Sequence, residues 1–276
     1  GWLLGFSIDL DAQLEANLLS QILLDNSASP LRRALEQTEL GGSPSPLCGL
    51  EESNHEMSFM CGVEGSEPEH AEAVETLILD TLKRVAEEGV EADIVESALH
   101  QLELHQREIG GDHYPYGLQL IFNALPAATH HGDPVAMLNL DPALARLRTN
   151  ASQPGWVQAA VTRLLLNNRH RVRYSLLPDA GLNAEAKRLE QQRLNTIRAN
   201  LTTDQLQAIR DQAEALQQRQ AAEDDPGLLP QVTLEDVKPE LHHVAPDNRY
   251  TEALTTTEYI AGTNGILYQQ LIADLP

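Results

Sequence analysis

Cysteine and aromatic residues are scarce in this sequence of 276 residues. There are two cysteines, Cys48 and Cys61, and aromatic residues make up 4% of the chain. Two cysteines are too few for a framework of disulfides or for a cysteine-rich metal cluster. Cys61 lies in an alternating, strand-like pattern, which predicts a buried and reduced thiol.

Long apolar runs are also missing. No run approaches the roughly 20 residues that a helix needs to cross a bilayer. The first residues show neither the basic region nor the cleavage pattern of a signal peptide. We therefore predict no membrane partner and a cytoplasmic protein of bacterial type, with a mitochondrion or another organelle left open.

Basic residues are outnumbered, since 19 Lys and Arg stand against 41 Asp and Glu, for a formal net charge of −22. Nucleic acid is therefore not an expected partner, because phosphate binding needs clustered Lys and Arg. Residues 51–112 hold 17 acidic and 3 basic residues. A surface of this kind attracts basic ligands. The alternative is that these charges only form a solvated, solubilising face.

A complete catalytic motif is absent as well. Zinc peptidases carry H-x-x-E-H or H-E-x-x-H on a helix, where the two His residues bind the metal and the Glu activates water. Residues 105–109 (HQREI) begin the first pattern, but Ile109 stands in place of the second His. Residues 55–59 (HEMSF) begin the second pattern, but Phe59 stands in place of the second His.

The remaining candidates for chemistry are weaker. His130-His131, with Asp133 nearby, could hold a metal adventitiously, and His242-His243 has no other ligand type in range. No G-x-S-x-G motif and no glycine-rich phosphate loop occurs. The adjacent pair Glu51-Glu52 is expected to carry surface charge. We therefore predict no catalytic, no cofactor-binding and no metal-binding residue in this chain.

The first 180 residues alternate between helical and strand-like patterns. Apolar residues at Leu10, Leu14, Leu18 and Ile22 predict a helix of about four turns. Strands are expected at 57–63 and 170–177. The other helices are expected at 30–37 with Ser29 as N-cap, and at 67–88, 91–108, 115–128, 142–147 and 154–166. This mixture predicts an α+β fold, with a small sheet packed against helices.

The composition changes near residue 181. Residues 183–224 contain no Gly or Pro and are rich in good helix formers, which predicts a long helical hairpin. Its break falls at 200–204, where Thr202 or Thr203 would cap the second helix. From residue 226 the chain is Pro-rich and extended. Residues 256–261 and 265–273 flank a Thr-Asn-Gly turn, which predicts a β-hairpin.

The ordered set of these segments closely resembles the presequence-protease subfamily of the pitrilysin/insulinase zinc metallopeptidases. Each segment alone is a weak signal, but their order and spacing match over nearly the whole chain. The segments that carry the resemblance are residues 1–36, 23–37 (LLDNSASPLRRALEQ), 57–65 (MSFMCGVEG), 74–104, 115–125 (PYGLQLIFNAL) and 229–237 (LPQVTLEDV).

The resemblance implies a place in a larger, clamshell-shaped enzyme. Residues 1–180 would be the non-catalytic α+β domain of its first half, 181–225 the helical hairpin linker, and 226–276 the start of the second half. Zinc would belong to the parent enzyme, and this chain would hold no cofactor. Its partners would be the remaining domains and unfolded peptide substrates. The chain would form part of the wall of the substrate chamber and be inactive alone.

Two other functions stay open. The chain could be a non-enzymatic scaffold of the same clan, like the core subunits of respiratory complexes, although those lack such a hairpin. It could also be an unrelated helical interaction protein. An unpaired strand edge at 265–273 would further favour self-association.

Overall fold

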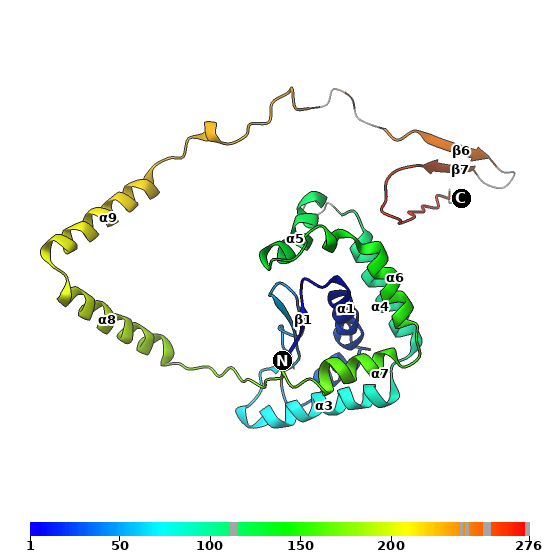
Figure 1. Ribbon diagram of the computed structural model, residues 1–276, viewed down its shortest axis with the longest axis horizontal. Helices are drawn as coiled ribbons and strands as arrows, with labels where there is room; N and C mark the ends of the chain where they lie inside the picture. The colour runs from blue at the N-terminus through cyan, green and yellow to red at the C-terminus, as the bar shows by residue number, and fades with distance from the viewer. Residues whose placement is uncertain (111–114, 238–239, 241–242, 251–254, 274–276) are drawn as a thin grey trace. The chain divides into compact units, whose positions relative to one another are not determined.

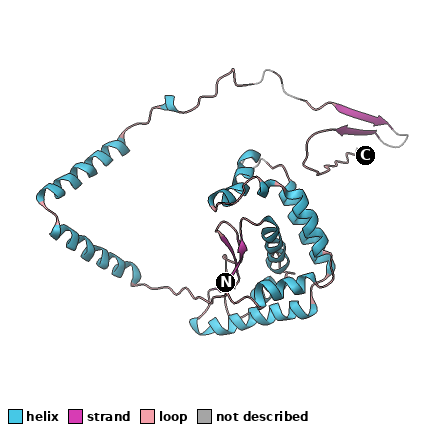
Figure 2. Ribbon diagram, in the orientation of Figure 1, coloured by secondary structure: helices cyan, strands magenta, loops and turns pink. Residues whose placement is uncertain are grey.

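The computed structural model describes residues 1–110, 115–237, 240, 243–250 and 255–273. The chain divides into two units, residues 1–175 with 262–276 and residues 176–261, and each is described by itself. Helices make up most of the regular structure (Figure 2). The α+β class predicted from the sequence is confirmed.

The first unit contains most of the secondary structure (Figure 1). Its helices are α1 (Leu10–Leu24), α2 (Pro30–Gln37), α3 (Ala71–Glu88), α4 (Ala92–Arg107), α5 (Tyr116–Thr129), α6 (Leu140–Ala151) and α7 (Trp156–Val161). Its strands are β1 (Trp2–Phe6), β2 (Ser43–Pro44), β3 (Gly49–Glu51), β4 (Glu56–Met60) and β5 (Val63–Glu64).

A small antiparallel sheet lies at the start of this unit. Its strand order is β1-β4-β3, and β2 pairs separately with β5. Along β4, Met57 and Phe59 are buried and their neighbours are not, which is the alternation predicted from the sequence. The same pattern fails at Cys61, which follows the strand and is half-buried rather than buried. The interior of the sheet therefore ends before the cysteine.

Helix α1 packs against the sheet and against α2, α4, α6 and α7, so it is the centre of the core (Figure 1). Asp9 accepts a hydrogen bond from the Ala12 N–H at 3.1 Å and caps the helix. Leu14, Leu18 and Ile22 are buried as predicted, whereas Leu10 is only half-buried. Neighbours on several sides bury a wider face of α1 than one apolar stripe requires.

Helix α2 begins after Ser29 as predicted, with Pro30 at its first position. The capping role expected of the Ser29 hydroxyl is wrong, however. This side chain is buried, accepts from the Asn26 N–H at 3.4 Å and donates to the Gln21 carbonyl at 3.5 Å. The hydroxyl therefore ties the α1–α2 turn together rather than capping α2, because the turn lies closer to it.

Helices α3 and α4 are separated by a short turn at Gly89. A single turn of 3-10 helix, Pro68–His70, precedes α3, so the predicted helix at 67–88 is present with a tighter first turn. Gly89 has φ 77° and ψ −161°, a backbone conformation that is essentially restricted to glycine. Its conformation explains why α3 ends where the sequence predicted.

Helix α7 continues into a π-helical turn, Thr162–Leu166. The Leu165 carbonyl accepts a hydrogen bond from the Trp2 indole N–H at 2.9 Å, and this bond is buried. The Trp2 ring also lies against Phe59, with the ring centroids 5.9 Å apart. Trp2 thus joins the first strand of the sheet to the last helix of the unit.

The strand predicted at 170–177 is mostly wrong. Within this segment only Arg171 forms a bridge, opposite Trp2, and Val172 exchanges hydrogen bonds of 2.9 Å with Gly1. Beyond that point Tyr174 and Leu176 are exposed. The alternating pattern is present, but β1 offers no residue before Gly1 against which a longer strand could pair.

The second unit begins with two helices, α8 (Leu182–Asn200) and α9 (Thr203–Ala221). Thr202 and Gln205 form a reciprocal capping box at the start of α9, which confirms one of the two predicted caps. Neither helix has a buried residue. The predicted packing of the two arms on an apolar seam is therefore not seen, because Leu189, Ile197 and Ile209 are each at least 44% exposed.

The β-hairpin of this unit differs from the predicted one. Strand β6 (Pro246–Tyr250) pairs with β7 (Thr255–Tyr259), whereas residues 265–273, all of them described, form no strand. The Asn264-Gly265 turn does form, with φ of 51° and 83°. Pairing with β6 already uses β7, so the residues after the turn have no strand to return along. The open edges belong to β6 and β7 instead of the predicted segment.

No helix in the part of the chain that the structure describes has the length and the apolar content needed to cross a membrane.

Candidate functional site

The first incomplete zinc motif, at residues 105–109, is not on one continuous helix. Helix α4 ends at Arg107, and Glu108 is already extended, with φ −64° and ψ 123°. His105 and Ile109 are exposed. The geometry of H-x-x-E-H needs its His and Glu side chains on one helical face, so these residues do not form that arrangement.

The second incomplete motif, at residues 55–59, lies on a strand. Glu56 begins β4, and Phe59 points into the core with 2% of its surface exposed. The His55 ring instead contacts Phe6 and His130, with centroid distances of 4.9 and 5.4 Å. A strand cannot place residues four apart as a helix does, so this pattern does not form a metal-binding helix.

The loop with His130, His131 and Asp133 does not bring its ligands together. The His130 Nε2 atom is 3.1 Å from the Ser53 carbonyl oxygen. The Asp133 carboxylate accepts from the backbone N–H groups of Val135 and Ala136, at 2.9 and 3.2 Å. Across the described residues, no group of three or more His, Cys, Asp or Glu is placed to hold a metal ion. His242 lies outside the described residues.

The pair Glu51-Glu52 faces two environments. Hydrogen bonds from Ser53 lower the pKa of the Glu51 carboxyl. Burial raises the pKa of the Glu52 carboxyl, although Gln13 and Asn17 of α1 donate hydrogen bonds that partly oppose this effect. Glu52 is therefore not the simple surface charge expected from the sequence, because the β3–β4 turn folds it against α1.

A network of charges joins α4 to α6. Glu103 pairs with Arg107 and with Arg148, and Arg107 also pairs with Asp141 at 2.7 Å. Burial would raise the pKa of the Glu103 carboxyl, but the hydrogen bonds from Arg148 and Arg107 outweigh it, and the pKa is lowered. The sequence pattern gave no sign of this network because Arg148 is far from Glu103 along the chain.

Glu103→Gln should lower the free energy of unfolding by about 1 kcal/mol at neutral pH, because a network of partly buried ion pairs is lost. A carboxyl whose pKa is lowered by folding stabilises the protein above its unfolded pKa. The difference from the parent protein should therefore disappear as the pH falls through the lowered pKa of Glu103. Urea unfolding at several pH values measures it.

The matched control is Glu96→Gln on the same helix, where the side chain is exposed and no ion pair is described. Its effect should stay within about 0.5 kcal/mol at every pH. An equal loss for both variants would show that the network adds nothing.

The most distinctive surface of the first unit is acidic. We call it the acidic surface, and it comprises exposed carboxylates at the end of α3, in the following turn and at the start of α4. They are Glu87, Glu88, Glu91, Asp93 and Glu96. Other carboxylates of the same region have cationic partners, such as Glu75 with Arg171 and Arg173. The acidic surface therefore presents negative charge to solvent.

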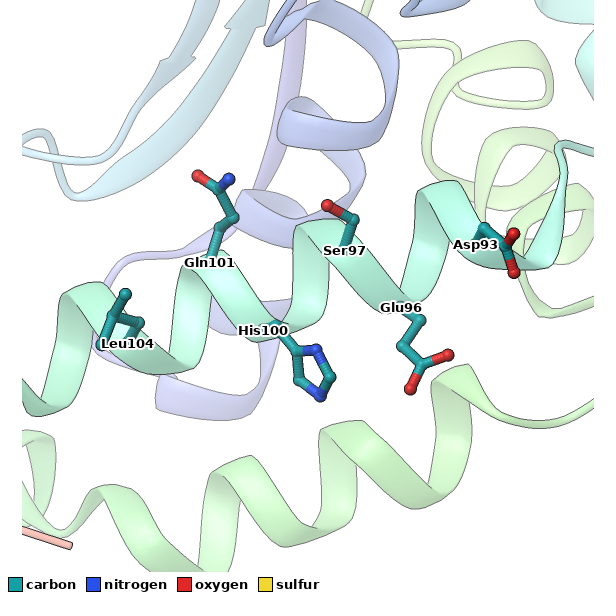
Figure 3. Close-up of a pocket in the computed structure, with 6 residues that line it drawn as sticks. All are labelled: Asp93, Glu96, Ser97, His100, Gln101 and Leu104. Carbon is teal, nitrogen blue, oxygen red and sulfur yellow. The ribbon is translucent and has the colours of Figure 1, made fainter. Parts of the chain in front are cut away.

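A shallow hollow runs along α4 beside the acidic surface (Figure 3). Its lining residues recur every three or four positions and so share one face of the helix. They are Asp93, Glu96, Ser97, His100, Gln101 and Leu104. A small-molecule site normally encloses most of its ligand with several elements. One helical face is better suited to contact with an extended polypeptide than to the enclosure of a metabolite.

Comparison with protein families gives two matches in this chain. Residues 2–102 match the family model described as "Peptidase M16 inactive domain". Residues 176–276 match a family model for the region associated with subfamily C of the M16 peptidases. The first match includes the sheet, α1 and most of α4, and the second begins before α8.

Comparison with curated proteins gives relatives along nearly the whole chain. "Presequence protease 1, chloroplastic/mitochondrial" of Arabidopsis thaliana is 29% identical over 281 residues, covering 99% of this chain and 26% of that protein. "Presequence protease, mitochondrial" of Xenopus tropicalis is 27% identical over 260 residues, covering 94% and 25%. "Protein HypA" of Clostridium perfringens is 25% identical over 270 residues, covering 97% and 27%.

The chain thus spans about a quarter of the length of these relatives. Their names and sources include mitochondria, chloroplasts and a bacterium, so the bacterial cytoplasm stays a prediction. The resemblance found in the sequence is confirmed by both comparisons, and the chain belongs to the M16 (pitrilysin/insulinase) peptidase family, where it is similar to the presequence proteases.

Proposed function

We propose that this chain is a non-catalytic part of a zinc metallopeptidase that degrades unfolded peptides, and that it forms part of the wall of the substrate chamber. The match of residues 2–102 to an inactive peptidase domain is the observation that carries this proposal. The two incomplete motifs support it, because neither places its His and Glu side chains together on a helix. Zinc would be held by another part of the longer protein.

The proposed division of labour follows the chain. Residues 1–180 would supply the wall, residues 181–225 the link to the second half, and residues 226–276 the first strands of that half. Helices α8 and α9 suit a linker, since every residue of α8 is exposed and neither helix has a buried side chain. Enclosure would exclude folded proteins, admit flexible peptides and keep the reaction away from bulk water.

The acidic surface gives the proposed wall a preference for basic peptides. Exposed carboxylates attract a basic chain over a distance set by ionic strength. Unfolded peptides expose their side chains and backbone, so an open surface can contact them without a preformed pocket. The acidic surface would therefore concentrate basic peptides rather than hold one sequence.

Reversing all five charges of the acidic surface to lysine should weaken binding of a labelled, unfolded basic peptide by about 10-fold at low salt. Fluorescence anisotropy with the 276-residue chain measures it, alongside an acidic peptide of equal length. The matched control reverses the same number of exposed acidic residues in the second unit, namely Asp204, Asp211, Glu214, Glu223 and Asp224.

The control variant has the same net charge, so it should retain most of the affinity if the position of the charges matters. Added salt should remove the difference between the parent chain and the first variant. Equal affinity for the basic and acidic peptides, or equal losses in both variants, would reject the role of the acidic surface.

The alternative is a non-enzymatic scaffold of the same clan, which an inactive domain would also fit. The two proposals differ in what the longer protein encodes before Gly1. An H-x-x-E-H motif there supports the peptidase, and a first domain without that motif supports the scaffold.

A further inference from the structure

We propose that Cys48 and Cys61 form an oxidisable dithiol, in which a hydroperoxide converts Cys48 to a sulfenic acid and Cys61 then closes an intrachain disulfide. The two cysteines lie at the open end of the β3–β4 pair and belong to no part of the proposed wall function. The proposal rests on their register, the hydrogen bonds of both thiols and the space around them.

The register places the two cysteines opposite each other. Strands β3 and β4 pair Leu50 with Phe59 and Gly49 with Met60. One further step along the same antiparallel register pairs Cys48 with Cys61. The two thiols are hydrogen-bond partners, so their side chains already meet. The Cys48 N–H bonds to the Ser45 carbonyl at 3.0 Å rather than to Cys61.

This arrangement suits a disulfide. Antiparallel residue pairs that lack mutual backbone hydrogen bonds have Cα atoms about 4.5 Å apart, with their side chains close together. A disulfide joins Cα atoms separated by roughly 4.4–6.8 Å. Closure of the Cys48–Cys61 bond would therefore need no large movement of the backbone.

The two thiols differ in acidity, which gives each its role. The hydrogen bond from Cys61 is the main cause that lowers the pKa of the Cys48 thiol to about 6, and the Gly62 N–H, at 3.3 Å from Sγ, adds to it. The hydrogen bond to Cys48 and burial raise the pKa of the Cys61 thiol. Cys48 is thus the thiolate at neutral pH, and Cys61 keeps its proton.

The pair is open to a small oxidant. Both cysteines are half-buried, and Leu47 beside Cys48 is exposed. A side chain built at Gly49 or at Gly62 would meet no atom within 4 Å. Space therefore remains next to each sulfur, whereas a structural cysteine in a closed core has none.

The chemistry balances in two steps. The Cys48 thiolate attacks one oxygen of a hydroperoxide, the O–O bond breaks, and a sulfenic acid and an alkoxide or hydroxide form. The Cys61 sulfur then attacks the Cys48 sulfur, the S–O bond breaks, and the thiol proton leaves with the hydroxyl group as water. Each sulfur is oxidised by one electron, and the hydroperoxide accepts both electrons.

The test treats the whole 276-residue chain with hydrogen peroxide and measures its intact mass and its free thiols. These are the only two cysteines in the chain. We expect a mass loss of two hydrogen atoms, complete loss of both free thiols and full reversal by dithiothreitol. Oxidised methionines would instead add oxygen, so the two products are distinguishable by mass.

Two variants assign the roles. Cys61→Ser should give a sulfenic acid that reacts with dimedone and no intrachain disulfide. In Cys48→Ser, the remaining thiol should react with iodoacetamide at neutral pH at least about 10-fold more slowly than Cys48 does in the parent. Circular dichroism checks that both variants fold, and the corresponding alanine variants replace any that does not.

Retention of both free thiols under peroxide, or a disulfide only between two chains, would overturn the proposal. Equal alkylation rates for the two cysteines would overturn the assignment of Cys48 as the attacking thiol.

Discussion

Replacing Leu18 by alanine should lower the free energy of unfolding of the first unit by about 2–5 kcal/mol. The Leu18 side chain is fully buried in the middle of α1, the helix that packs against the sheet and against several other helices. Removing it takes apolar contacts away and leaves a cavity between elements that the rest of the core holds apart. Urea unfolding followed by tryptophan fluorescence measures the loss.

This readout is specific, because Trp2 and Trp156 are the only tryptophans and both belong to the first unit. The matched control is Leu189→Ala on α8, where the side chain is 51% exposed. It should change the same transition by no more than about 0.5 kcal/mol. A similar loss for both variants would contradict the placement of the core around α1.

Trp2→Ala should destabilise the first unit by about 3–5 kcal/mol. The indole is 4% exposed, contacts Phe59 and donates its N–H to the Leu165 carbonyl at 2.9 Å. Trp2→Phe separates these contributions, since it keeps an aromatic ring but removes the donor. That variant should lose about 1–3 kcal/mol, the cost of an unsatisfied buried carbonyl.

The matched control for this pair is Trp156→Phe, at a half-buried position on α7. It should cost less than Trp2→Phe in the same unfolding experiment, now followed by circular dichroism for all three variants. Full stability of Trp2→Phe would show that the bond to the π-helical turn does not contribute to the fold.

The helices of the first unit could be predicted because each carries its own local signals. Asp9 caps α1, Pro30 opens α2 and Gly89 ends α3, and all three act within one turn of the chain. The role of Ser29 could not be predicted, because the Gln21 carbonyl that it bonds is set by the angle between two helices.

The strands were harder to predict because pairing depends on distant residues. Residues 170–177 alternate well, yet only Arg171 among them finds a partner strand. The Asn264-Gly265 turn forms as predicted, but β7 pairs with β6 rather than with the residues after the turn. Local alternation and turn chemistry do not state which strand is already occupied.

The site followed the same division. The absence of a complete zinc motif could be read from residues 105–109 and 55–59 directly. The meeting of Cys48 with Cys61 and of Glu103 with Arg148 could not, since each depends on tertiary pairing. For the cysteines a usable signal existed, because they flank the two strands of one short hairpin, and antiparallel register brings such flanking residues together.

Cleavage of an unfolded peptide by the purified 276-residue chain, with zinc added and with a chelator in a parallel sample, tests the central claim most directly. If this chain encloses substrate while another part of the protein holds the metal, mass spectrometry should find the peptide intact in both samples. Peptide cleavage that depends on zinc and stops with the chelator would contradict the account.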